Sequence, residues 1–210
     1  MLGLSLTPAT VSALHAYADL VRSTNTAFNL VSRQDIDRLE TRHILDCLAM
    51  VAFLKSAQWP PDSHEERRRI LDIGSGAGLP GIVIAIACPE LEVTLVDRSA
   101  RKHRFLQRAV STLQLANVAT KCHDVVAQGI EGEFEIITSR AVAPVALMWI
   151  WLVSHLVDRG MFIHMSFTAA GPSCESPVLT GGSTCLVPLE IPGLAERHWL
   201  TVVRKESSHV

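Results

Sequence analysis

The chain has 210 residues, 48% of them hydrophobic and 19% charged, and its formal net charge is −2. A chain of this length buries one ample core, and the near-neutral charge excludes a globally basic nucleic-acid binder while allowing a local basic face. The five cysteines form no C-x-x-C pair, which indicates reduced thiols in a cytosolic protein.

The first predicted element is a helix that begins at Thr7-Pro8, a hydroxyl N-cap followed by proline at the first helical position. An apolar stripe then recurs every three or four residues, at Val11, Leu14, Ala18 and Val21. No basic segment followed by a long apolar run precedes it, so we expect no signal peptide and a cytoplasmic location.

A second helix is predicted over residues 35–54, with one side formed by Ile36, Leu39, His43, Cys47 and Val51. His43 and Asp46 allow two interpretations, an acid–base or metal pair or a hydrogen-bonded core histidine. The second is the more common on the apolar side of a helix, so we favour it. Residues 57–66 are then predicted to form a loop.

From Ile70 onward, short β-type runs alternate with helical stretches. Strands are predicted at 69–73, 92–97, 134–139 and 161–165, helices at 80–87, 101–113 and 141–153, and two final strands at 189–192 and 198–205. Such alternation predicts βαβ units and a parallel sheet. We expect a helical N-terminal cap (1–65) on an α/β domain (66–210), together one compact unit. The helix at 141–153 is shorter than the roughly 20 residues that span a bilayer, and we expect its Trp149 and Trp151 to pack inside.

Four glycines in "LDIGSGAGLPGI", residues 71–82, allow two interpretations. Gly76-x-Gly78-x-x-Gly81 matches a dinucleotide fingerprint, with Asp97 where a ribose-binding acid is expected. Asp72-x-Gly74-x-Gly76-x-Gly78 instead matches the first motif of S-adenosylmethionine-dependent methyltransferases. A carboxylate at Asp72 would repel a pyrophosphate, whereas S-adenosylmethionine carries an ammonium and a sulfonium instead of phosphates. The pattern therefore favours a methyl-donor site, in which Asp97 suits the ribose hydroxyls.

Three further segments accompany this loop: residues 28–48 ("FNLVSRQDIDRLETRHILDCL"), 137–143 ("ITSRAVA") and 196–205 ("ERHWLTVVRK"). Together with "GLPGI" they resemble the GidB (RsmG) family, which methylates N7 of a guanine in bacterial small-subunit ribosomal RNA. The resemblance implies a class I, Rossmann-like methyltransferase fold with a mostly parallel seven-stranded sheet.

The resemblance also implies a cofactor site for S-adenosylmethionine. The first motif and the resemblance together give these expected cofactor-binding residues: Asp72, Gly74, Gly76, Gly78, Leu79, Asp97, Val125, Val126 and Arg140. Val125 and Val126 match the backbone that contacts the adenine, and Arg140 matches the arginine of an S-R-A motif. The sequence departs from the family where a lysine-glycine pair usually ends the fifth strand, because residues 164–167 read His-Met-Ser-Phe. The helix that normally follows is replaced by the Gly/Ser/Pro-rich residues 168–185.

Cations cluster directly after Asp97, at Arg98, Arg101, Lys102, Arg104 and Arg108. On a helix, positions 101, 104 and 108 share a face, which favours phosphate contacts over a merely solvated surface because it adjoins the predicted cofactor site. We expect small-subunit ribosomal RNA, within a ribosomal subunit or an assembly intermediate, as the partner. No metal is expected, since Cys122-His123-Asp124 is a single cluster of adjacent residues.

Guanine N7 presents an in-plane lone pair, so its methylation needs no general base, and we assign none. Two alternatives remain open: a methyltransferase with a different RNA substrate, and a degenerate, non-catalytic relative with a regulatory or assembly role.

Overall fold

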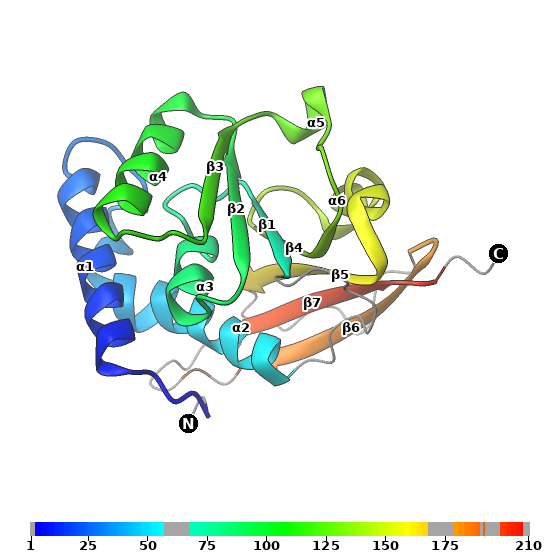
Figure 1. Ribbon diagram of the computed structural model, residues 1–210, viewed down its shortest axis with the longest axis horizontal. Helices are drawn as coiled ribbons and strands as arrows, with labels where there is room; N and C mark the ends of the chain where they lie inside the picture. The colour runs from blue at the N-terminus through cyan, green and yellow to red at the C-terminus, as the bar shows by residue number, and fades with distance from the viewer. Residues whose placement is uncertain (1–2, 57–67, 168–178, 190, 192–197, 208–210) are drawn as a thin grey trace.

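The computed structural model describes residues 3–56, 68–167, 179–189, 191 and 198–207, and its strands form one seven-stranded sheet (Figure 1). The strand order is β3-β2-β1-β4-β5-β7-β6. Their bounds are β1 Arg69–Ile73, β2 Glu92–Asp97, β3 Val118–Cys122, β4 Phe134–Arg140, β5 Leu156–Phe167, β6 Gly182–Leu189 and β7 His198–Lys205. The first five strands pair in parallel, and β7 runs antiparallel to both β5 and β6. The predicted mostly parallel seven-stranded α/β sheet is confirmed.

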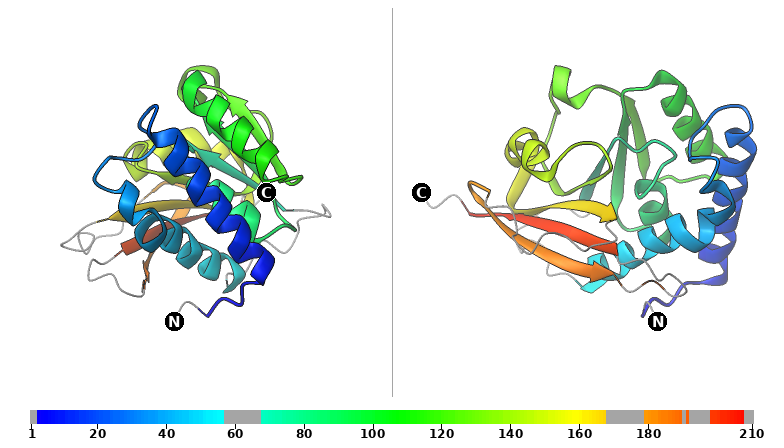
Figure 2. Two further views of the ribbon diagram at one scale, coloured as in Figure 1. Left: turned by 90° about the vertical axis from the view of Figure 1, so that its left-hand side faces the viewer. Right: turned by 180° about the vertical axis from the view of Figure 1, so that it is seen from behind.

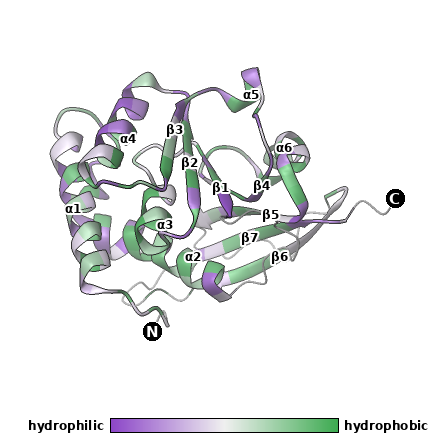
Figure 3. Ribbon diagram, viewed as in Figure 1, coloured by the Kyte–Doolittle hydropathy of each residue, from purple (hydrophilic) through white to green (hydrophobic). Residues whose placement is uncertain are grey.

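Helices cover both faces of the sheet (Figures 1 and 2). They are α1 Pro8–Asn25, α2 Leu45–Ser56, α3 Gly81–Ala87, α4 Ala100–Thr112, α5 Val125–Gln128 and α6 Val145–Leu152. Neighbouring strand residues point to opposite faces. Ile136 accordingly belongs to the core that includes residues of α1 to α4, and Ile137 to the core beneath α6. Hydrophobic residues predominate in the central strands and in α3, whereas α4 carries many hydrophilic residues (Figure 3).

The first helix has the predicted start. The Thr7 hydroxyl oxygen accepts a hydrogen bond from the backbone N–H of Thr10 over 3.1 Å, and the helix begins at Pro8. Leu14, Tyr17, Ala18 and Val21 are buried. The predicted stripe is wrong at Val11, which is 39% exposed, because the buried side of α1 begins at Leu14.

The second helical region is not one continuous α-helix. It consists of a 3₁₀ turn (η1, Ile36–Arg38), a π-helical segment (η2, Leu39–Ile44) and then α2. The predicted face is otherwise right, because Leu39, His43, Cys47 and Val51 are buried. π-helical segments are rare and frequently occur at functional sites.

Two predictions about the C-terminal half are wrong. The penultimate strand, β6, ends at Leu189, where the predicted strand was expected to begin. It contains the β-favouring run 184–187, which lies in a stretch whose composition is typical of a loop. Trp149 is buried as predicted, but Trp151 is only half-buried. The loop predicted at 57–66 and residues 168–178 lie outside the described residues. Within the described part of the chain, no helix is long and apolar enough to cross a membrane.

Candidate functional site

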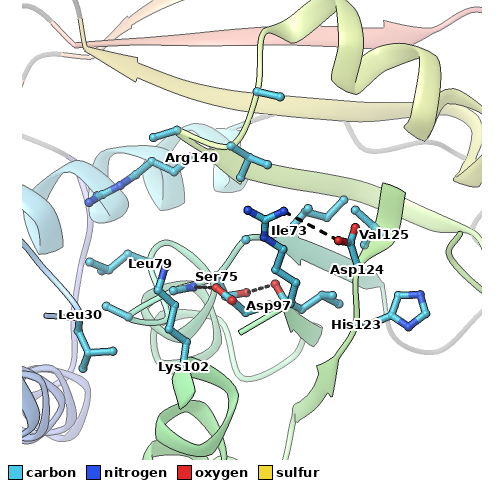
Figure 4. Close-up of a pocket in the computed structure, with 18 of the residues that line it drawn as sticks. Leu30, Ile73, Ser75, Leu79, Asp97, Lys102, His123, Asp124, Val125 and Arg140 are labelled. Carbon is cyan, nitrogen blue, oxygen red and sulfur yellow. Dashed lines mark hydrogen bonds and ion pairs between the residues drawn. The ribbon is translucent and has the colours of Figure 1, made fainter. Parts of the chain in front are cut away.

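A pocket of about 580 Å³ opens where β1, β2 and β4 end (Figure 4). Its walls come from the glycine loop, the segments after β2, β3 and β4, and the N-terminal residues Leu30, Val31, Ser32, Asp35 and His43. Ligands of open α/β sheets bind beyond the carboxyl ends of the strands, and pockets that hold them measure about 300–1,000 Å³. The pocket has the position and size of a cofactor site.

The glycine loop approaches the pocket closely at Gly74. Its φ is +69°, and a Cβ added there would lie 2.5 Å from Cγ2 of Val142. Gly76 and Leu79 also line the pocket, but Gly78 does not, because it packs against Ile82 of α3. Of the predicted glycines, Gly74 and Gly76 therefore face the cavity, and Gly78 shapes the turn into α3.

Asp97, the last residue of β2, lines the pocket and fixes the loop. Its Oδ2 accepts a hydrogen bond from the backbone N–H of Gly76 over 2.9 Å, and its Oδ1 accepts one from Ser99 over 2.8 Å. A carboxylate offers about four acceptor positions. Each oxygen of Asp97 therefore retains capacity for a ligand hydroxyl.

Asp72, by contrast, does not line the pocket. It is fully buried and accepts hydrogen bonds from the backbone N–H of Gly81 over 3.1 Å and from the Thr138 hydroxyl over 3.0 Å. Burial raises its pKa to about 6, although these hydrogen bonds act in the opposite direction. Its observed contacts join the end of β1, directly before the glycine loop, to α3 and β4.

Val125 and Val126 begin α5 and both line the pocket. Asp124 caps this helix, and its Oδ1 accepts a hydrogen bond from the backbone N–H of Val126 over 3.1 Å. Figure 4 shows His123, Asp124 and Val125 at one end of the pocket, with Leu30 and Arg140 at the other.

Arg140 lines the pocket at the end of β4, and its Nη2 donates a hydrogen bond to Nδ1 of His43 over 3.1 Å. His43 is only 6% exposed. Burial is the main cause that lowers its pKa to about 4, and the nearby positive charge of Arg140 is the second. Asp46 faces elsewhere, with its Oδ1 2.7 Å from Nδ1 of the equally buried His198. His43 and Asp46 thus do not form a pair, and no cluster of potential metal ligands occurs among the described residues.

The predicted basic cluster divides into two parts. Arg98 and Lys102 line the pocket, and Arg98 lies 3.9 Å from Asp124. The others, Arg101, Arg104 and Arg108, are exposed on α4. The Arg101 guanidinium lies 4.4 Å from the centre of the Phe28 ring, which joins α4 to the segment after α1.

Two contributions of the N-terminal region to the site were not predicted from the sequence. The Tyr17 hydroxyl donates a hydrogen bond to the carbonyl oxygen of Ala77 in the glycine loop over 2.7 Å. Asp35 lines the pocket, where its carboxylate accepts hydrogen bonds from Ser32 and Arg42. Only the position of Asp35 within residues 28–48 could have indicated it.

The GidB family model, described as rRNA small subunit methyltransferase G, matches residues 10–170. Ribosomal RNA small subunit methyltransferase G of Cupriavidus necator is 34% identical over 217 residues, covering 99% of this chain and 92% of the relative. The protein of the same name from Polaromonas naphthalenivorans is 38% identical, covering 93% and 88%.

Solved structures share the fold. A mutant of MtNAS in complex with S-adenosylmethionine has a TM-score of 0.58 at 16% identity, covering 93% of this chain and 72% of that one. The N-methyltransferase NodS from Bradyrhizobium japonicum has a TM-score of 0.55 at 16% identity, covering 82% and 99%. The predicted class I methyltransferase fold is confirmed, and the chain belongs to the GidB family, rRNA small subunit methyltransferase G.

Proposed function

We propose that this protein transfers a methyl group from S-adenosylmethionine to N7 of a guanine in small-subunit ribosomal RNA. The observation that carries the proposal is the close approach of the Gly74 backbone to a pocket whose rim holds Asp97, in a chain that belongs to the GidB family.

The pocket residues fit S-adenosylmethionine. At Gly74 the backbone lies so close to the pocket wall that an added Cβ would collide with Val142, so only glycine fits there. Asp97 has acceptor capacity for ribose hydroxyls, and Val125 and Val126 offer an apolar surface for an adenine. These features fit the adenosine part of the methyl donor, and membership of the GidB family favours this donor over a dinucleotide.

When bound, S-adenosylmethionine supplies an electrophilic methyl group. Guanine N7 has a lone pair in the plane of the ring, so no residue has to remove a proton. The pocket walls therefore have to orient the two reactants and exclude water, and such orientation lowers a barrier by about 7–11 kcal/mol. Leu30 and Leu79 line the pocket and provide apolar surface for this task. The base has to leave its stack to enter.

We further propose that the RNA is presented within a ribosomal subunit or an assembly intermediate, in the cytoplasm, and that Arg101, Arg104 and Arg108 contact its phosphates. All three side chains are exposed on α4, next to the pocket-lining Lys102. The cap (1–65) and the methyltransferase domain (66–210) are proposed to fold together. In support, buried residues of α1, α2 and α3 belong to one hydrophobic cluster.

The test uses S-adenosylmethionine with a labelled methyl group. The protein is incubated with small subunits, and separately with naked small-subunit RNA, from cells that lack its gene. Label is expected at one guanine, where borohydride and aniline cleave the RNA because N7 is methylated. Label in another RNA, or at another atom, would favour a different substrate. Cofactor binding without any transfer would favour a non-catalytic role.

A further inference from the structure

One part of the pocket wall has no assigned contact with the methyl donor. The glycine loop, Asp97 and Val125 account for one part of its wall. The N-terminal segment contributes a separate wall that includes Leu30, Ser32 and Asp35. Figure 4 shows Leu30 and Arg140 far from His123 and Val125. A donor with its adenine beside Val125 leaves this second wall to face the methyl acceptor.

Asp35 is the acidic side chain of that wall, and it is held from several directions. Its Oδ2 accepts a hydrogen bond from the Ser32 hydroxyl over 2.8 Å, and its Oδ1 accepts one from Nη1 of Arg42 over 2.9 Å. The pKa of Asp35 lies below its usual value. The hydrogen bond from Ser32 is the main cause, the positive charge of Arg42 contributes less, and partial burial opposes both. The side chain is 27% exposed, so a ligand can reach it. Asp35 is thus an oriented, ionised carboxylate that still has acceptor positions for a ligand.

His43 completes the support of Asp35. Arginine has no acceptor, so Arg140 donates to Nδ1 of His43, and the neutral ring carries its proton on Nε2. That atom lies 3.9 Å from Oδ2 of Asp35 and has no hydrogen-bond partner among the described residues. The N–H is buried beside the carboxylate and adds a favourable dipole to that side of the pocket. The π-helical segment Leu39–Ile44 places His43 between Arg140 and Asp35.

Resting on the proposed function, we propose that Asp35 is the residue that selects guanine, by accepting hydrogen bonds from N1–H and the 2-amino group of the target base. These two donors lie on the edge of the purine opposite N7. A carboxylate at the N-terminal wall that holds this edge therefore directs N7 toward the glycine loop. Adenine presents a lone pair at N1 and no 2-amino group, so the carboxylate repels it.

The test replaces the target nucleotide. Once the methylated guanine is mapped, small-subunit RNA is joined from fragments that carry guanine, inosine or 2-aminopurine at that position. Inosine lacks the 2-amino group, and 2-aminopurine lacks the N1 proton. The wild-type protein and the variants Asp35→Asn and Asp37→Asn are compared by kcat/KM. Asp37 is the matched control because it is exposed in the 3₁₀ turn that directly follows Asp35 and does not line the pocket.

The wild-type protein is expected to prefer guanine over inosine by about tenfold and over 2-aminopurine by about 100-fold, as lost hydrogen bonds to a charged group predict. In Asp35→Asn the preference over inosine should nearly disappear and the preference over 2-aminopurine should fall about tenfold, whereas both should persist in Asp37→Asn. The intrinsic reactivity of each N7 is common to all three proteins, so the change in preference reports the contact itself.

Calorimetry with S-adenosylmethionine shows whether each variant is folded. If Asp35→Asn loses cofactor binding, Asp35→Ser, which also removes the carboxylate, takes its place in the comparison. Unchanged preferences in a folded Asp35→Asn, or wild-type methylation of 2-aminopurine as fast as guanine, would overturn the assignment of Asp35 and leave the proposed function intact. Absence of any guanine methylation by the wild-type protein would overturn both.

Discussion

The carboxylate of Asp97 and the backbone N–H of Gly76, 21 positions apart in the chain, are joined by a hydrogen bond of 2.9 Å. The last residue of β2 thus fixes the glycine loop that follows β1. The same carboxylate caps the next turn through Ser99. One acidic side chain therefore positions the loop and faces the pocket.

Asp97→Asn should weaken binding of S-adenosylmethionine by about 10- to 100-fold, because an amide offers one acceptor oxygen where the carboxylate uses two. Isothermal titration calorimetry measures the change. Glu92→Gln is the matched control, since Glu92 lies on the same strand but is exposed. Equal affinities in the two variants would show that Asp97 does not organise the site.

Gly74→Ala should reduce affinity for the methyl donor at least about tenfold, because the residue has φ +69° and its new Cβ meets Val142. Adding Val142→Ala should restore part of the loss if the collision matters. Gly132→Ala introduces similar backbone strain at φ +91° with no atom within 4 Å of the Cβ, and should leave affinity unchanged. Normal binding by Gly74→Val would place the cofactor elsewhere.

Tyr17→Phe should lower the free energy of unfolding by about 1–2 kcal/mol, because it removes the hydroxyl that hydrogen-bonds to the carbonyl of Ala77 inside the fold. Since Ala77 belongs to the glycine loop, affinity for the cofactor should fall as well. Urea unfolding and calorimetry measure the two effects. A stability loss with unchanged affinity would show that α1 does not influence the loop.

These contacts show which parts of the structure were predictable. Strands β1, β2, β4, β5 and β7 and helices α1, α3, α4 and α6 follow from short periodic runs, whereas β3 and α5 were not predicted. The class of cofactor site follows from four closely spaced glycines near Asp72 and Asp97. Tyr17 and Asp35 were not predicted as site residues, and a core position was favoured for His43. Their contacts depend on long-range packing of the N-terminal region against the glycine loop and the end of β4.

The errors have similar causes. The stripe of α1 was extended to Val11 because periodicity does not show where a helix leaves the core. Strand β6 was misplaced because its flanking glycines, serines and prolines are typical of loops, while pairing with β7 overrides local propensity. A continuous second helix was predicted because a four-residue repeat at 39, 43, 47 and 51 does not distinguish π from α geometry.

His43 should make stability depend on pH. Its pKa is about 4 in the folded protein and about 6.5 when exposed, so the unfolded chain takes up the proton first as pH falls. The contribution is complete above pH 6.5 and is lost as pH falls toward 4. Between pH 7 and pH 5 the wild-type protein should lose about 2 kcal/mol more than His43→Gln.

Urea unfolding of both proteins at the two pH values measures this difference. Asp72 acts in the opposite direction, since its raised pKa of about 6 gives a contribution that is lost as pH rises. It is present in both proteins and cancels in the comparison. Identical pH dependence of wild type and His43→Gln would mean that His43 is not held neutral.

The double variant Arg104→Gln/Arg108→Gln should weaken RNA binding and make it less sensitive to salt. Each lost phosphate contact reduces the slope of log K against log salt concentration by about 0.7–0.9. Filter binding over a salt series gives the slope, and calorimetry should show unchanged cofactor affinity. Arg159→Gln, an exposed residue outside α4 and the pocket, is the control. A slope equal to wild type would place the RNA on another surface.

The proposed function requires that the glycine-loop pocket hold a methyl donor. Calorimetric titration of the purified protein with S-adenosylmethionine, its demethylated product and NAD tests this directly. We expect saturable binding of the first two at one site per chain and no binding of NAD. Binding of NAD in preference to S-adenosylmethionine would contradict it.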